Sequence, residues 1–197
     1  MPEQILTERQ RLLGFLPLLF FLAQGTHYWR IDQLGHMLWM CNIGNLLLAV
    51  GLFIDEPVLI RVAAIWTIPG LFIWLRYVVT TWVNYAALDW SAVLASTLAH
   101  VGGLTVALIA IARVRINRSA WGFAVIWFFA LQLVARMVTP PEFNVNLSRS
   151  IYPGWENTFS AYWKFWLVLS LVVVGGCWII TQGLVRLWPP RSNISVW

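Results

Sequence analysis

Charged side chains are scarce in this sequence. Only 11% of its 197 residues are Asp, Glu, Lys or Arg, whereas 60% are hydrophobic. A soluble domain usually carries about 25% charged residues. A small domain also exposes much of its surface, so a single soluble core could not hide this many apolar side chains. A lipid environment removes that conflict, and the composition therefore predicts an integral membrane protein.

Several motifs of soluble chemistry are also missing. The chain has no HExxH, no DxxD and no acidic pair within an apolar run, so we expect no metal site; Walker and Rossmann glycine patterns are absent too. The two cysteines, Cys41 and Cys177, form no CxxC motif and indicate no redox compartment. The net charge of +5 comes from basic residues scattered between apolar runs, without a basic stripe. Nucleic acid is therefore not an expected partner.

The chain does contain six apolar runs. A helix needs about 20 residues to cross the hydrocarbon core. The runs lack the alternation of a β-barrel, and in lipid the backbone must then be helical. The sequence predicts an all-α polytopic bundle, one transmembrane domain over residues 1–197, with six transmembrane helices at about 12–29, 36–54, 58–83, 91–112, 119–138 and 161–187. The first run is short, but Glu3 and Glu8 before it favour an uncleaved span over a secretory signal.

Basic residues predict the orientation. With the N-terminus inside, the cytoplasmic side carries Arg9, Arg11, Arg113, Arg115, Arg118, Arg186 and Arg191. Short loops as basic as residues 113–118 rarely cross a membrane. Both termini are therefore expected in the cytoplasm, and the protein in a cytoplasmic (inner) or plasma membrane. Many of the 14 Trp residues lie near the ends of the runs, where indole rings anchor in the headgroup layer.

Polar side chains gather in the outer half of the predicted bundle, where depth is counted at 1.5 Å per residue. They are Gln24, His27, His36, Cys41, Asn42, Asn45, Arg76, His100, Gln132 and Arg136. Such groups are costly in hydrocarbon, about 2.5–3.5 kcal/mol for a central Arg, so they turn inward, pair or line water. We expect an outward-facing pocket capped by the outer loop 139–160. The alternative is a hydrogen-bond network that only locks the helices together.

Other residues carry narrower expectations. Pro69-Gly70 is expected to kink the third helix. The pairs Gly102-Gly103 and Gly175-Gly176 are expected to permit close helix packing, and Cys177 to pack in the inner half. Arg76 is expected to pair with an acid or to line the pocket, and its candidate partners are Glu142, Asp89 and Glu156.

Cys41 and His100 lie on different predicted helices at compatible depths. A thiol with an imidazole in reach is the minimal set for acyl transfer, because the imidazole takes the proton and the thiolate attacks a carbonyl carbon. The alternatives are packing for Cys41 and a hydrogen bond to a carbonyl across the bundle for His100. Oxyanion donors would come from Asn42, Asn45 or Arg76. The predicted substrate-binding residues are His36, Asn42, Asn45, Arg76 and Arg136.

Three short segments carry a resemblance to a known family. They are His36-Met-Leu-Trp-Met-Cys41, Ala99-His100-Val-Gly102, and Asn144-Val-Asn146 before Tyr152. The pattern resembles the YwaF-type integral membrane family and its eukaryotic acyltransferase relatives, which pair a cysteine in an early helix with a histidine in a later one. The resemblance implies that Cys41 is the nucleophile and His100 the base of a lipid acyl-transfer or lipid-modifying enzyme.

Other classes of function stay open at this point. The polar layer also suits a non-catalytic ligand-binding or transport protein for a lipid or a small polar or anionic ligand, with Arg76 and Arg136 as counter-charges. A third class is haem ligation by two of His27, His36 and His100. A fourth is an accessory subunit of a complex, whose partners would be the lipid bilayer and other membrane subunits.

Overall fold

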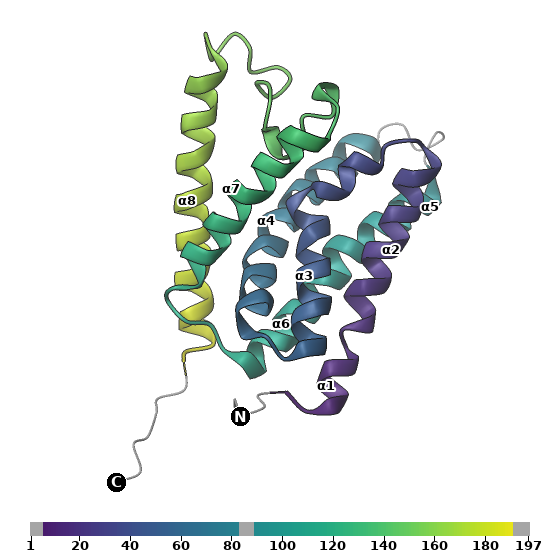
Figure 1. Ribbon diagram of the computed structural model, residues 1–197, viewed down its shortest axis with the longest axis vertical. Coiled ribbons are helices and arrows are strands. Elements are labelled where there is room, and N and C mark those ends of the chain that lie inside the picture. The colour runs from purple at the N-terminus through teal and green to yellow at the C-terminus, as the bar shows by residue number, and fades with distance from the viewer. Residues whose placement is uncertain (1–5, 83–88, 191–197) are drawn as a thin grey trace.

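The computed structural model describes residues 6–82 and 89–190, and these residues form helices, turns and connecting segments without strands. The helices are α1 (Glu8–Leu12), α2 (Phe15–Arg30), α3 (Met40–Ile54), α4 (Pro57–Trp82), α5 (Trp90–Thr97), α6 (Gly103–Val114), α7 (Ala120–Val138) and α8 (Tyr162–Leu187). A π-helical turn over Leu98–Gly102 joins α5 to α6, so that Trp90–Val114 is one continuous helix. Figure 1 shows an elongated bundle with α8 along one edge.

Within the described residues, four helices are long and apolar enough to cross a membrane. They are Pro57–Thr80, Trp90–Val114, Ala120–Val138 and Tyr162–Leu187. The remaining apolar helices are shorter, with 16 residues in α2 and 15 in α3. The structure thus has the all-α, membrane-type architecture that the composition predicts, and it indicates an integral membrane protein.

Helix α3 begins later than the sequence predicts. Residues Leu34–Leu38 form a 3-10 turn, the extended Trp39 follows it, and the helix starts at Met40. A hydrogen bond from α3 stabilises this turn: the Asn42 side chain donates to the His36 carbonyl at 3.0 Å. His36 therefore precedes the helix and does not open it, which corrects the predicted span of 36–54.

The apolar core lies where α3, α4 and α6 meet. Leu48, Ile65 and Ile111 are completely buried there. Trp66 is also completely buried, and its indole Nε1 donates to the Ala124 carbonyl at 3.2 Å, which fastens α4 to α7. Residues this large and this inaccessible fix the spacing of the helices, because packed interiors tolerate little change in volume.

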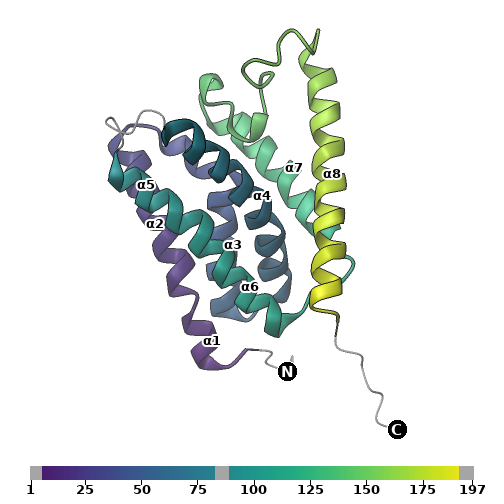
Figure 2. The same ribbon diagram turned by 180° about the vertical axis from the view of Figure 1, so that it is seen from behind.

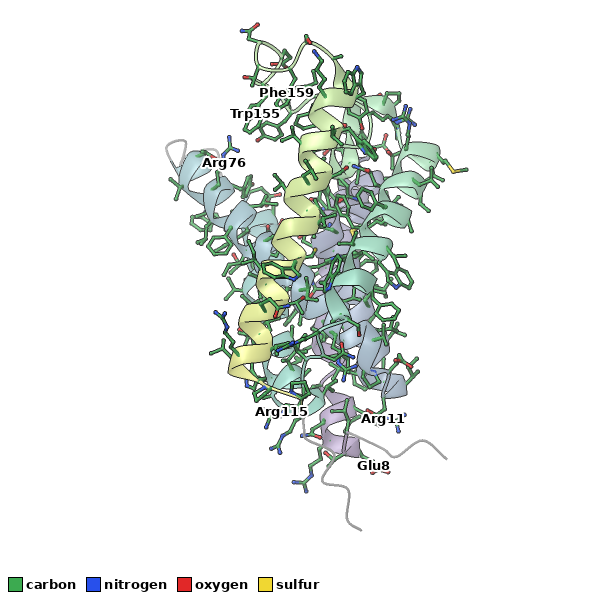
Figure 3. The ribbon with its side chains drawn as sticks, turned by 90° about the vertical axis from the view of Figure 1, so that its left-hand side faces the viewer. Glu8, Arg11, Arg76, Arg115, Trp155 and Phe159 are labelled. Atoms are coloured by element: carbon green, nitrogen blue, oxygen red, sulfur yellow. The ribbon has the colours of Figure 1, made fainter. Side chains whose placement is uncertain are left out.

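The two ends of the bundle differ in the residues they carry. In Figure 3, Glu8, Arg11 and Arg115 lie at one end, and Arg76 lies at the other with Trp155 and Phe159. Helix α1 and the last turn of α8 share the end with Arg11 (Figures 1 and 2).

Basic side chains at this end bind the free carbonyls of helix C-termini. Arg11 Nε donates to the Phe53 carbonyl at 2.8 Å, and Arg61 Nε donates to the Arg115 carbonyl at the same distance. These two arginines thereby close the C-terminal ends of α3 and α6.

The segment 139–160 forms an ordered cover at the opposite end. Asn144 adopts a left-handed backbone (φ 42°), and its Oδ1 accepts hydrogen bonds from the Arg149 and Ser150 amides, both at 3.0 Å. The Phe159 ring packs on the buried Phe165 of α8 with 5.4 Å between centroids. The segment is thus held by its own turns and by α8.

Candidate functional site

The polar residues expected in one pocket do not all lie together. Cys41, Asn42, Asn45 and His100 lie among α3, α4 and the continuous helix α5–α6, as their contacts below show. Arg136 lines a different groove between α7 and α8, together with Gln132. The expectation of one pocket for all these residues is therefore corrected, because residues at similar depths on different helices face different neighbours.

Cys41 and His100 both lie next to Gly70. A Cβ built on Gly70 would lie 3.1 Å from the Cys41 Cβ and 3.5 Å from the His100 Cδ2. Both side chains therefore flank the same bare stretch of α4, next to Pro69. A larger residue at position 70 would push α3 and α5–α6 away from α4. The structure thus brings together the two residues that the sequence singles out as nucleophile and base.

His100 lies within the π-helical turn and is 9% exposed. Its Nδ1 lies 2.7 Å from the Ser96 carbonyl oxygen. A carbonyl only accepts, so Nδ1 carries the proton, and the neutral ring then keeps the lone pair on Nε2. This Nε2 adjoins the Cδ2 that faces Gly70. This hydrogen bond stays within the helix and does not reach across the bundle, as the alternative expected, and it leaves Nε2 free to accept a proton.

Trp74 is a neighbour of His100 that sequence reasoning missed. The two rings lie nearly parallel, at 19°, with centroids 6.4 Å apart. The buried Trp74 Nε1 has no hydrogen-bond partner among the described residues. Position 74 is one helical turn from Gly70, so both residues share the face of α4 that contacts His100. That spacing of four was the only signal in the sequence.

Asn45 ties the two helices of the site together. Its Nδ2 donates to the Cys41 carbonyl at 3.0 Å and to the Ala99 carbonyl at 2.9 Å. Asn45 is completely buried, and its Oδ1 would lie 2.3 Å from a Cβ built on Gly103. Gly103 thus permits close packing, as the sequence predicts. Both amide protons of Asn45 are committed, so it positions the site and is not an oxyanion donor.

Asn42 faces a second neighbour, the end of α2. Its Nδ2 donates to the His36 carbonyl, and its side chain lies beside the Tyr28 hydroxyl, as does that of Gln24. The buried acceptors Gln24 Oε1 and Asn42 Oδ1 make no hydrogen bond to the described residues. Asn42 Nδ2 has a second N–H besides the one donated to His36, so its role as an oxyanion donor stays a prediction.

Within the described residues, Arg76 makes no ion pair with Glu142, Asp89 or Glu156, so the expected acidic partner is corrected. The Arg76 guanidinium instead lies 5.5 Å from the centroid of the Tyr152 ring. Asp89 is engaged elsewhere. Its Oδ1 accepts from the Ser91 hydroxyl at 2.7 Å and caps α5, and its Oδ2 lies 3.9 Å from His27 Nδ1. The hydrogen bond from Ser91 is the main reason that the pKa of the Asp89 carboxyl is lowered.

His36 lies at the surface of the bundle, outside the contacts of Cys41 and His100 described above. Its ring stacks on Phe143 with 4.6 Å between centroids, and Tyr28 lies at 5.4 Å. Burial between these rings lowers the pKa of His36 from its ordinary value of 6.5. The structure therefore gives His36 a packing contact with the cover segment 139–160.

Arg136 and Gln132 belong to a network around Asn146. Gln132 Nε2 donates to the Asn146 carbonyl at 3.0 Å, and its Oε1 accepts from Trp166 Nε1 at 2.9 Å. Arg136 Nη1 donates to the Ser148 carbonyl at 2.8 Å. These contacts are of the kind that locks helices together, which was the alternative reading of the polar layer.

Two further expectations concern glycine and metal. Gly175 and Gly176 have nothing within 4 Å of a built Cβ in the part of the chain that the structure describes, so they make no close helix contact there, contrary to the prediction. Cys177 is buried in α8, as predicted. Over residues 6–82 and 89–190, no three His, Cys, Asp or Glu side chains are grouped closely enough to hold a metal ion.

The chain was compared with family models, with curated proteins and with solved structures, and none of them matches it.

Proposed function

We propose that this chain is a six-span membrane enzyme that transfers a lipid acyl group through Cys41, with His100 as the base. The observation that carries the proposal is the shared contact of Cys41 and His100 with Gly70, together with the His100 tautomer that leaves Nε2 able to accept a proton. The position of His100 in a π-helical turn adds support, because such turns are frequent at functional sites. The resemblance to the YwaF-type family is part of this proposal.

Six spans and cytoplasmic termini are part of the same proposal. The shorter helices α2 and α3 run alongside the long ones in Figures 1 and 2. An even number of crossings agrees with α1 and the end of α8 lying at the same end of the bundle. That end also carries Arg11 and Arg115, as expected of the cytoplasmic side.

The topology can be tested with single cysteines in a protein lacking Cys41 and Cys177. The exposed residues Asn157 and Ser119 lie on opposite sides in the proposal. An impermeant maleimide should label N157C in intact cells, and S119C only after permeabilisation. Equal labelling of both in intact cells would contradict six spans with internal termini.

The proposed reaction has two half-steps. His100 Nε2 takes the Cys41 proton, and the thiolate attacks the carbonyl carbon of a lipid ester. The C–O bond breaks, the leaving alcohol takes the proton from the imidazolium, and an acyl thioester remains on Cys41. A hydroxyl or amine of the acceptor then attacks the thioester, and the thiol is regenerated.

The test is capture of the thioester. Purified protein is incubated with a phospholipid carrying a radiolabelled acyl chain, and the protein-bound label is treated with neutral hydroxylamine, which cleaves thioesters. Wild type and Cys177→Ala should acquire hydroxylamine-sensitive label, Cys41→Ala none, and His100→Gln at a rate lower by about 10²–10⁴-fold, as expected on removal of a general base. Unchanged labelling of Cys41→Ala would overturn the proposal.

A non-catalytic binding role is the second candidate. It is favoured by the buried acceptors of Gln24 and Asn42 beside the Tyr28 hydroxyl, which suit a small ligand rich in hydrogen-bond donors. In that case the chain would be a ligand-binding, transport or accessory subunit, and hydroxylamine-sensitive label would not form.

A further inference from the structure

We infer that the groove between α7 and α8 binds an anionic phospholipid, with the phosphate at Arg136 and Ser148 and an acyl chain along Phe129 and Leu133. This groove does not include Cys41, His100 or Gly70, so the inference does not rest on the proposed acyl transfer. Its volume is about 450 Å³, within the range of ligand sites, roughly 300–1,000 Å³. Its lining residues are Phe129, Gln132, Leu133, Arg136, Ser148 and Trp166.

The helices themselves create the groove. Figures 1 and 2 show α7 and α8 lying close at the end shared with α1 and diverging toward the segment 139–160. Trp166 Nε1 of α8 donates a hydrogen bond to Gln132 Oε1 of α7 at 2.9 Å. These two polar atoms of the groove lining therefore satisfy each other. The remaining wall is apolar, as a hydrocarbon chain requires.

The polar end of the groove is built of donors. Arg136 Nη1 donates to the Ser148 carbonyl at 2.8 Å, which holds the guanidinium beside Ser148. The guanidinium also lies beside the Tyr162 hydroxyl, 5.9 Å from the ring centroid, and since it has five N–H donors, some remain available for an oxyanion. Ser148 is 2% exposed, and its hydroxyl has no hydrogen-bond partner among the described residues. A buried hydroxyl without a partner on the wall of a groove points to a ligand that supplies an acceptor.

The charge of Arg136 is not neutralised by the protein. Within residues 6–82 and 89–190, the ion pair is that of His27 with Asp89, and no carboxylate pairs with Arg136. Arg149 at the same end donates to the carbonyls of Arg136 and Thr139 and adds positive charge. Arginine and hydroxyl donors together match the oxygens of a phosphate. The complementary occupant is therefore anionic.

The depth of the groove identifies that anion as a lipid. Arg136 lies two residues from the end of α7, about 3 Å along the axis, which is headgroup level in a spanning helix. Phe129 lies about 10 Å deeper along the same helix, level with hydrocarbon. A ligand that reaches both has a phosphate at one end and an acyl chain at the other.

The inference is tested by native mass spectrometry of the purified full chain with added phosphatidylglycerol. Wild type should retain one tightly bound lipid. Arg136→Gln should bind it at least about tenfold more weakly, and Ser148→Ala should weaken binding without loss of stability, since it removes a hydroxyl that has no protein partner. The matched control Lys164→Gln removes a cation at the same end that does not line the groove, and it should leave binding unchanged.

A second pair of variants tests the acyl chain. Leu133 is 59% exposed on the groove wall, so Leu133→Trp should fill the groove and block binding without unfolding the protein. Leu171→Trp, on an equally exposed part of α8 outside the groove, is its control. Equal effects of Arg136→Gln and Lys164→Gln, no effect of Leu133→Trp, or full competition by glycerol phosphate would each overturn a lipid site.

Discussion

At the scale of single residues, Asn146 connects more of the molecule than any sequence signal indicated. Its Oδ1 accepts from the Met40 amide at 3.0 Å, and its Nδ2 donates to the Leu38 carbonyl at 2.7 Å. Its own carbonyl accepts from Gln132. One buried side chain in the cover segment therefore forms hydrogen bonds with the backbone at the start of α3, just before Cys41. The position of Cys41 depends on this contact.

Asn146→Asp should destabilise the protein. The substitution keeps the acceptor for Met40 but replaces the donor with an oxygen that faces the Leu38 carbonyl. Loss of a buried hydrogen-bond partner costs about 1–3 kcal/mol, so the free energy of unfolding should fall by that amount. Asn157→Asp, at an exposed position of the same segment, should change it by less than about 0.5 kcal/mol. Denaturant unfolding in detergent compares them, and equal values would exclude this role of Asn146.

His36 makes stability depend on pH. Burial lowers the pKa of His36 in the folded state, so below its ordinary value of 6.5 the unfolded chain takes up the proton first. The stability that neutral His36 supports is complete above pH 6.5 and declines as the pH falls through the folded pKa. His36→Phe keeps a ring on Phe143 but cannot titrate. The melting temperature of wild type should therefore fall more between pH 8 and pH 5 than that of His36→Phe. Parallel curves would refute this.

At the scale of elements, glycines determine how closely the helices of the site approach. Gly70 admits Cys41 and His100 to α4, and Gly103 admits Asn45 to α6. Gly102 admits the Phe20 ring of α2 at 2.8 Å from a built Cβ. Helices α2, α3 and α5–α6 thus each approach a neighbour where a glycine in the middle of a helix lacks a side chain.

Gly103→Ala should separate α3 from α5–α6. The new Cβ would lie 2.3 Å from Asn45 Oδ1, and Asn45 cannot turn away without losing its bonds to Cys41 and Ala99. Overpacking of this kind costs about 1–3 kcal/mol, and any activity that needs Cys41 near His100 should fall with it. Gly175→Ala is the matched control, since nothing lies within 4 Å of its Cβ. Similar losses of thermal stability in both variants would contradict the packing described for Gly103.

At the scale of the whole molecule, the bundle combines an apolar half with a half that contains hydrogen-bonding side chains. The Leu48–Ile65–Ile111 core holds the end that carries Arg11 and Arg115. The rest of the bundle holds Cys41 and His100 beside Gly70, the α7–α8 groove and the cover segment.

The sequence predicted how deep the polar side chains lie along their helices. It did not predict which neighbouring helix each side chain faces. Counting residues along each helix placed Cys41 and His100 at compatible depths, because the helical rise is regular. Depth does not say which neighbour a side chain faces, so Arg136 was assigned to the wrong group. Asn42 and Asn45 donate hydrogen bonds to backbone carbonyls at a 3-10 turn and a π turn. No residue pattern in the sequence predicts these two turns. Hydrogen bonds to such carbonyls become visible only in three dimensions.

The most direct test of the account is the rate at which Cys41 reacts with a small methanethiosulfonate as pH is varied. The protein carries Cys177→Ala, so that Cys41 is the only thiol. If His100 Nε2 accepts the Cys41 proton, the reaction near pH 7 should be at least about tenfold faster with His100 than with His100→Gln, and the two rates should converge at high pH. Coincident curves, or a Cys41 that never reacts, would contradict it.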